Sequence, residues 1–133
     1  MDHEMLANIF MHQLKGIMFH ADAYCVSVLH GYRRLKMQHC KAAKSETANF
    51  MMTRYKSIEY LGEIIDIPAV TRLEVPHDAS EHDIVDMWLK WETEAVELYA
   101  KAVAAEPQCH LWSTLHQAAA NEIKCITKMY LRL

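Results

Sequence analysis

The sequence predicts an all-α protein that folds as a four-helix bundle, and three observations support this. The 133 residues include only three Gly and three Pro, so few positions interrupt regular structure. Helix formers such as Ala, Leu, Met, Glu and Lys fill the long stretches between these breakers. No segment shows the sustained alternation of apolar and polar residues that is typical of strands. We therefore expect one domain, residues 1–133, with a core large enough to be stable without disulfides or a structural metal.

The charge and hydropathy of the chain exclude several classes of partner. A net charge of -3 and the absence of a basic stripe give no surface that would attract nucleic acid. The longest apolar runs are too short to span a membrane. Met1 is followed by Asp2 and Glu4, the opposite of the basic start of a signal peptide. We expect a cytoplasmic protein that binds neither nucleic acid nor membrane.

The four cysteines form no recognisable metal or redox motif. No pair of them has C-x-x-C spacing, so the sequence indicates neither a zinc site nor a thioredoxin-like site. In a reducing compartment we expect free thiols, most of them packed as small core residues. They are Cys25, Cys40, Cys109 and Cys125.

The first two predicted helices run from about Asp2 to His30 and from about Tyr32 to Glu63. Gly31 suits the left-handed residue that ends a helix. Because a single Gly joins them, the two helices must be antiparallel. Each has a line of residues spaced three or four apart, as expected of a helix face. The line of the first is Leu6, Phe10, Gln13, Ile17, His20, Tyr24 and Val28, and that of the second is Leu35, His39, Ala42, Glu46, Phe50, Thr53 and Ser57.

The segment from Ile64 to Ala79 is predicted to be a long crossover. With Pro68 and Pro76 it is unsuited to a continuous helix, and it is too long for a tight turn between helices. It is also too apolar for a free linker, so we expect it to pack along the bundle. A connection of this kind makes the second and third helices parallel.

The third helix is predicted to begin after Ser80, because Ser80 and Asp83 have the spacing of a capping box. Pro107 is expected in the first turn of the fourth helix, which then continues to Leu133.

The third helix has apolar residues on more than one side. This excess predicts further burial by self-association, giving a homodimer or a larger homo-oligomer.

Four segments in this order of elements are similar to a known family. They are Ile58-Glu59, Ile67-Pro68, Asp83-Ile84-Val85-Asp86-Met87 and Glu92-Thr93-Glu94-Ala95-Val96-Glu97-Leu98-Tyr99. The chain resembles the ferritin-like superfamily, in particular the bacterioferritins and Dps-like proteins, over roughly residues 45 to 130. The resemblance implies a ferritin-like four-helix bundle, in which a long crossover joins the second helix to the third.

The resemblance also implies a site for two irons inside the bundle. In this family one Glu comes from each of two helices, and an E-x-x-H pair comes from each of the other two. Glu92 matches the third-helix Glu, and Glu122 matches the Glu of the fourth-helix pair. Cys125 stands where the His of that pair would be. The dinuclear site is therefore altered or lost.

The other half of the family's ligand set is replaced by weak ligands. Gln13 stands near the place of the first-helix Glu, and Phe50 and Thr53 stand at the places of the second E-x-x-H pair. Glu46 and Asn49 keep an E-x-x-N spacing one turn earlier, and they could rebuild a site. The residues predicted to bind metal are Glu92, Glu122, Glu46, His20 and Cys125.

Two interpretations of these carboxylates stay open. Carboxylates on the inner lines of three helices are costly unless they are paired or bind a metal. The alternative is that Glu46 and Glu92 lie at the edges of their lines and reach solvent or a Lys. A histidine or cysteine on the inner line of a helix is also more often a packed core residue than a metal ligand, and this alternative applies to His20 and Cys125.

Haem is a second cofactor that the resemblance implies. Met51 or Met52 lies where bacterioferritins place a methionine that binds haem between two subunits. A methionine on a helix is more often core or interface filler, which disfavours haem here.

Two classes of function follow from these residues. The first is iron binding or storage, with ferroxidase-type oxidation of Fe(II) by peroxide or dioxygen. The second is a bundle without a cofactor that acts in assembly or partner binding. Glu92 and Glu122 favour the first class, and the absence of an E-x-x-H pair from the four predicted helices favours the second.

Overall fold

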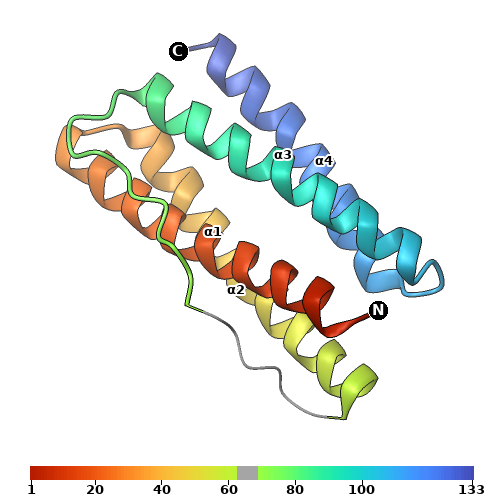
Figure 1. Cartoon of the computed structure of the whole chain (residues 1–133). Coiled ribbons are helices and arrows are strands. Elements are labelled where there is room, and N and C mark those ends of the chain that lie inside the picture. The colour runs from red at the N-terminus through yellow and green to blue at the C-terminus, as the bar shows by residue number, and fades with distance from the viewer. Residues whose placement is uncertain (63–68) are drawn as a thin grey trace.

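The chain folds as a bundle of four helices in the computed structural model, which describes residues 1–62 and 69–133. Helices α1 and α2 form one antiparallel hairpin, and α3 and α4 form a second (Figure 1). The described residues contain no strand. The predicted all-α four-helix bundle is confirmed. The helices are α1 His3–His30, α2 Arg33–Leu61, α3 Glu81–Ala105 and α4 His110–Leu131.

Local capping signals fix three of the helix ends where the sequence predicts them. The Asp2 carboxylate accepts a hydrogen bond of 2.8 Å from the amide of Met5 at the start of α1. Gly31 ends α1 with φ 72, a left-handed conformation that glycine adopts without strain. At the start of α3, the amide of Ser80 donates to Asp83 Oδ2 and the amide of Asp83 donates to Ser80 Oγ. These two bonds form the predicted capping box.

The prediction that Pro107 lies in the first turn of the fourth helix is wrong. Helix α4 begins at His110, and Pro107 lies in the turn before it. The amide of Cys109 donates to the carbonyl of Glu106 at 3.0 Å, so the chain completes a turn around Pro107 before the helix starts. A proline favours a tight turn as readily as a first helical turn.

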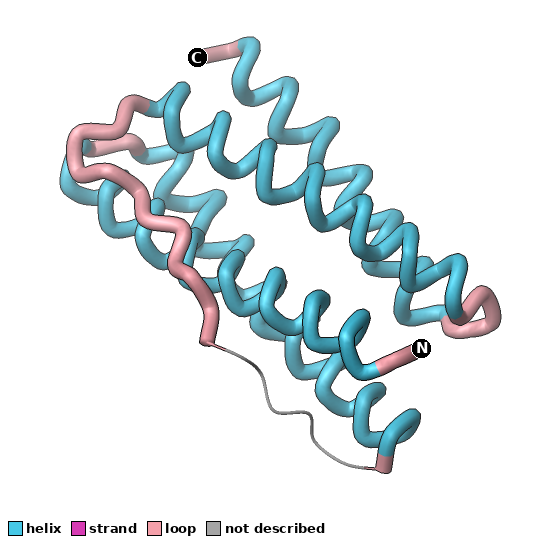
Figure 2. Tube along the Cα trace, in the orientation of Figure 1, coloured by secondary structure: helices cyan, strands magenta, loops and turns pink. Residues whose placement is uncertain are grey.

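The connection between α2 and α3, called the crossover below, packs on the bundle as predicted. Its described part, residues 69–79, runs back beside the first hairpin to the start of α3 (Figure 2). The carboxylate of Asp22 accepts from the Arg72 guanidinium and from the amide of Val75. Val75 and Ala79 are buried in the core. The first five residues that the sequence assigned to the crossover, 64–68, lie outside the described residues, as does Glu63, the predicted end of the second helix.

Two further expectations from composition can be compared with the structure. The prediction that most cysteines are core residues is wrong, because Cys25, Cys40 and Cys125 are exposed and only Cys109 is buried. Their positions on the outer faces of the helices account for this difference. In the described residues, no helix combines the length and the apolar character that crossing a membrane requires.

The two hairpins contact each other mainly where α1 meets α3, while α2 and α4 barely touch. At the contact, Gly16 lies against the Trp91 indole so closely that an added Cβ would be 2.1 Å from Trp91 Cζ2. Trp91 Nε1 donates to the carbonyl of His12 at 3.1 Å, and His12 Nε2 lies 3.0 Å from the carbonyl of Trp91. The two rings are stacked with centroids 4.6 Å apart. These contacts set how closely the hairpins approach.

We predict that Gly16→Ala destabilises the protein. Alanine in a helix interior is normally more stable than glycine by roughly 0.5–1 kcal/mol, but here its methyl group would overlap the Trp91 ring. The free energy of unfolding, measured with urea, should fall by about 1–3 kcal/mol. In a Trp91→Leu background the same substitution should be neutral or stabilising. A gain in stability from Gly16→Ala alone would contradict this packing.

Candidate functional site

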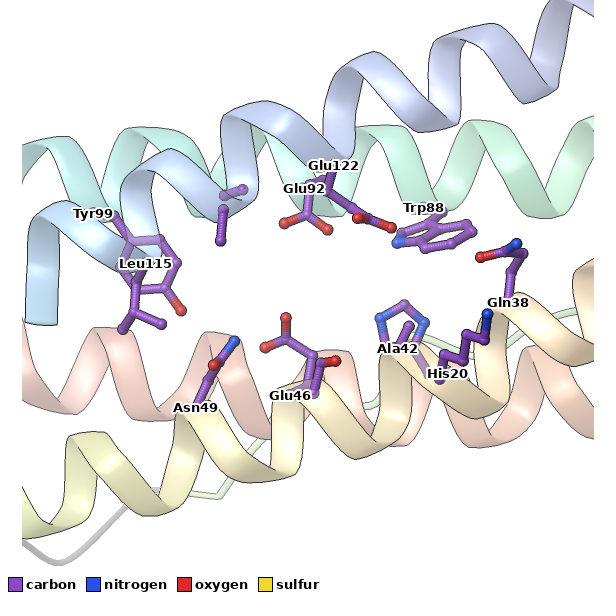
Figure 3. Close-up of a pocket in the computed structure, with 14 residues that line it drawn as sticks. His20, Gln38, Ala42, Glu46, Asn49, Trp88, Glu92, Tyr99, Leu115 and Glu122 are labelled. Carbon is purple, nitrogen blue, oxygen red and sulfur yellow. The ribbon is translucent and has the colours of Figure 1, made fainter.

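A cavity of about 390 Å³ opens between the two hairpins, on the side where α2 and α4 are separated. Three glutamates from three helices line it: Glu46 of α2, Glu92 of α3 and Glu122 of α4. Figure 3 shows Glu46 projecting from one wall toward Glu92 and Glu122 on the opposite wall. The other lining residues that bear on its chemistry are His20, Lys41, Asn49, Trp88 and Tyr99.

Helical spacing places each glutamate at this cavity. Glu92 lies on the buried face of α3, one turn after Trp88, and is only 4% exposed. Glu122 is half-buried on α4, between the buried residues Ala119 and Ile126. Glu46 is partly buried, and its Oε2 atom has no hydrogen-bond partner in the described part of the chain. The alternative that Glu92 lies at an edge and reaches solvent is therefore wrong.

The glutamates have no cationic side chain bound to them. In the part of the chain that the structure describes, no ion pair includes Glu46, Glu92 or Glu122. Lys41 lines the same cavity but is exposed. A buried ionised carboxylate without a partner costs several kcal/mol (order of magnitude), so the cavity favours neutral carboxyls or a bound cation.

Burial and mutual repulsion raise the pKa of these carboxyls. Burial, followed by the charges of Glu46 and Glu122, raises the pKa of Glu92 to about 9. Burial and the charge of Glu122 raise the pKa of Glu46 to about 7. Burial also raises the pKa of Glu122. A cation that enters must therefore replace protons, and its binding strengthens as the pH rises.

A pair of buried histidines lies beside the cavity, and one of them, His20, lines it. His20 Nδ1 lies 2.9 Å from His39 Nδ1, and the two side chains are 1% and 0% exposed. Burial lowers the pKa of His39 to about 3, and burial and the neighbouring His39 lower the pKa of His20 well below its usual value. Both rings are therefore neutral. The sequence placed His39 on an inner line of the second helix, but its role was missed because only the fold brings it to His20.

The positions that the resemblance to ferritin-like proteins assigns to the other iron ligands are occupied by neutral side chains. Gln13 Nε2 donates to Thr53 Oγ1 at 2.9 Å and to the Tyr99 hydroxyl at 3.0 Å, and all three side chains are buried. Phe50 packs edge-on against Phe10, with centroids 5.4 Å apart. None of these groups is a carboxylate. The acidic residues gather in the cavity instead.

The structure brings together four of the five residues predicted to bind metal. Glu46, Glu92, Glu122 and His20 line one cavity, whereas Cys125 is exposed and outside it. As they stand, no three His, Cys, Asp or Glu side chains of the described residues lie close enough to hold a metal ion. The four side chains fit a cation by donor type, and Glu46 Oε2 is free to bind one. To bind a cation, the carboxylates must move closer together, or the ion must keep water molecules that bridge it to them.

The two residues predicted to bind haem do not belong to this cavity. Met51 and Met52 are 38% and 44% exposed on α2, and neither contributes to the lining. A haem at these methionines would have to be shared with a second copy of the chain. It stays a prediction.

Comparison with known proteins supports the fold. No protein-family model matches the chain, and no curated protein matches it. Among solved structures it is similar to "CopM in the Cu(II)-bound form", with a TM-score of 0.64 and 9% sequence identity. The alignment covers 92% of this chain and 94% of that chain. At this identity the similarity shows that the two chains share the helical-bundle fold.

We predict that Glu92→Gln stabilises the protein at pH 8 and has little effect at pH 4. In the unfolded chain Glu92 ionises above about pH 4.5, whereas in the folded chain its pKa is about 9. The wild-type protein therefore loses stability as the pH rises through this window, and a neutral amide removes the loss. Urea unfolding at pH 8 should show a gain of roughly 1–4 kcal/mol.

The matched control for this prediction is Glu97→Gln, an exposed glutamate on the same helix. A surface substitution of this kind should leave the stability unchanged within about 0.5 kcal/mol at both pH values. If the effect of Glu92→Gln were the same at pH 4 and pH 8, the protonation of Glu92 in the folded state would be refuted.

Proposed function

We propose that the chain is a metal-binding helical bundle that takes up a divalent transition-metal cation into the cavity between its hairpins. One observation supports this most directly: Glu46, Glu92 and Glu122 face one cavity from three helices, and no cationic side chain of residues 1–62 and 69–133 forms an ion pair with them. Three glutamates in such a place do not stabilise the bundle by themselves, because burial of each carboxylate costs desolvation free energy. A cation would offset that cost.

The glutamates would bind the cation directly, and each would give up its proton in doing so. Carboxylate oxygens suit hard and borderline cations, and the carboxylate of Glu46 has one oxygen with no other partner. Asn49 and Tyr99 add neutral oxygens at the cavity wall. Lys41, on the exposed side, would move away or remain at the entrance.

Iron is the first metal to test, because the resemblance to ferritin-like proteins implies it. Copper is the second, because the similar structure CopM was solved in a Cu(II)-bound form. Iron storage or Fe(II) oxidation would need further ions beyond the one for which this cavity has carboxylates. We therefore place metal binding first and ferroxidase activity second.

We predict stoichiometric binding of Fe(II) by the wild-type protein in anaerobic titrations, with release of protons. Glu92→Gln combined with Glu122→Gln should abolish binding, because amides are poor metal ligands and carry no charge. Affinity should increase from pH 6 to pH 9 as the raised carboxyl pKa values are passed. Isothermal calorimetry in two buffers of different ionisation enthalpy measures the stoichiometry, the affinity and the number of protons released.

The control for this titration is Glu97→Gln, which removes one exposed carboxylate from α3. It should bind as the wild type does. Equal, weak and nonstoichiometric binding by the wild type and the double Gln variant would contradict metal binding. The same titrations with Cu(II) compare the two metals.

Assembly is the second candidate function, and the outer face of α2 favours it. Met51, Tyr55 and Ile58 are exposed and spaced four and three apart, so they form one apolar stripe, with Met52 beside it. We propose that this stripe, Met51–Met52–Tyr55–Ile58, is covered by a second copy of the chain. Association of this kind is compatible with the metal-binding function.

Light scattering at micromolar concentration should report at least a dimer. Met51→Lys with Tyr55→Lys should reduce the assembly to a monomer without loss of helix content, since both side chains are exposed. Lys44→Met on the same helix is a control that should not weaken association, because it adds no charge. A stable wild-type monomer of 15.4 kDa would contradict self-association.

A further inference from the structure

We infer that His20 adds a nitrogen ligand to the cavity through its Nε2 atom, and that His39 accepts the hydrogen bond from His20 Nδ1 that this tautomer requires. The cavity would then prefer first-row transition-metal ions to Mg²⁺ and Ca²⁺. This inference rests on the proposed metal-binding function and names both the class of metal and a positioning residue.

The contact between the two rings allows only two arrangements of protons. A neutral imidazole carries one proton, and the 2.9 Å contact joins Nδ1 of His20 to Nδ1 of His39. A hydrogen bond needs one proton between these atoms, so one ring donates and the other accepts. The donor ring then has a bare Nε2, and the acceptor ring has its proton on Nε2.

Each arrangement gives the cavity a different group from His20. If His20 Nδ1–H donates to His39, then His20 Nε2 offers a lone pair that can bind a metal. If His39 donates, His20 Nε2–H can only donate to a carboxylate. A cation in the cavity selects the first arrangement, and ionised glutamates without a cation select the second. Both rings stay neutral in either arrangement.

The surroundings hold His39 in place for this role. Its ring packs against Trp88, with centroids 4.4 Å apart, and edge-on against Phe19. Its Nε2 atom is buried and has no hydrogen-bond partner among the residues that the structure describes, whereas its Nδ1 atom contacts His20. His20 is itself held between the edges of two indoles, those of Trp88 and Trp91. The imidazole that faces the cavity is therefore preorganised, and Figure 3 shows it standing between Glu46 and Trp88.

A nitrogen ligand changes which cations the site prefers. Carboxylate and carbonyl oxygens suit Mg²⁺ and Ca²⁺, whereas imidazole suits Fe, Cu and Zn. Metal-binding histidines nearly always use their second ring nitrogen in a hydrogen bond that fixes the tautomer, and loss of that partner lowers affinity about 10–100-fold. His39 occupies the place of that partner.

The test uses the full chain and Zn²⁺, with Mg²⁺ as the oxygen-preferring comparison. His39→Phe keeps the ring shape but cannot accept a hydrogen bond, and it should weaken Zn²⁺ binding about 10–100-fold while leaving Mg²⁺ binding unchanged. His20→Phe should weaken Zn²⁺ binding at least as much. His116→Phe, a half-buried position on α4 outside the cavity, is the matched control and should bind as the wild type does.

A second measurement does not depend on how well the variants fold. Nitrogen-15 spectra of the histidine rings in the wild type should show His20 protonated at Nδ1 when Zn²⁺ is bound, with its Nε2 resonance shifted by the metal. A bound-state spectrum with His20 protonated at Nε2 would overturn the inference.

The outcomes separate this inference from the proposed function. If Zn²⁺ binds equally to the wild type and both Phe variants, but not to Glu92→Gln with Glu122→Gln, the histidine role is overturned and metal binding stands. If the wild type binds neither Zn²⁺ nor Fe(II), both are overturned. Selective loss of Zn²⁺ binding in the Phe variants supports both.

Discussion

The close approach of Gly16 to Trp91 is the contact on which the rest of the structure depends. It brings α1 and α3 together, and the paired hydrogen bonds between His12 and Trp91 fix their relative position along the helix axes. Because the hairpins are joined at this seam, α2 and α4 on the other side are free to stay apart. The cavity is the space that this asymmetric docking leaves.

The cavity gathers buried ionisable side chains, which disfavour folding, in a small part of the bundle. Glu46, Glu92 and Glu122 favour protonation because water is excluded and because they repel one another when ionised. The neighbouring histidines favour the neutral form because water is excluded from them as well. The bundle tolerates this because its two apolar clusters lie at either side of the cavity, toward the two ends of the helices.

Most of the fold could be predicted from the sequence, because caps, glycines and helical spacing act within a few residues. The capping box at Ser80 and the turn at Gly31 are examples. The cavity could be predicted only in part: Glu92 and Glu122 were found from the family pattern. The His20–His39 pair could not, since it depends on the register of two helices. That Cys125 is exposed while Glu122 lines the cavity depends in the same way on how α4 is rotated.

The anchoring of the crossover at Asp22 has a consequence for the order of folding. Its contacts with Arg72 and Val75 join residues that are 50 and 53 positions apart, so a loop containing all of α2 closes when they form. Closing so long a loop costs chain entropy that a two-helix hairpin does not have to supply. The α1–α2 hairpin should therefore form early, and the crossover should attach to a hairpin that already exists. Since the crossover leads into α3, docking of the α3–α4 hairpin at Trp91 should follow the formation of the first hairpin as well.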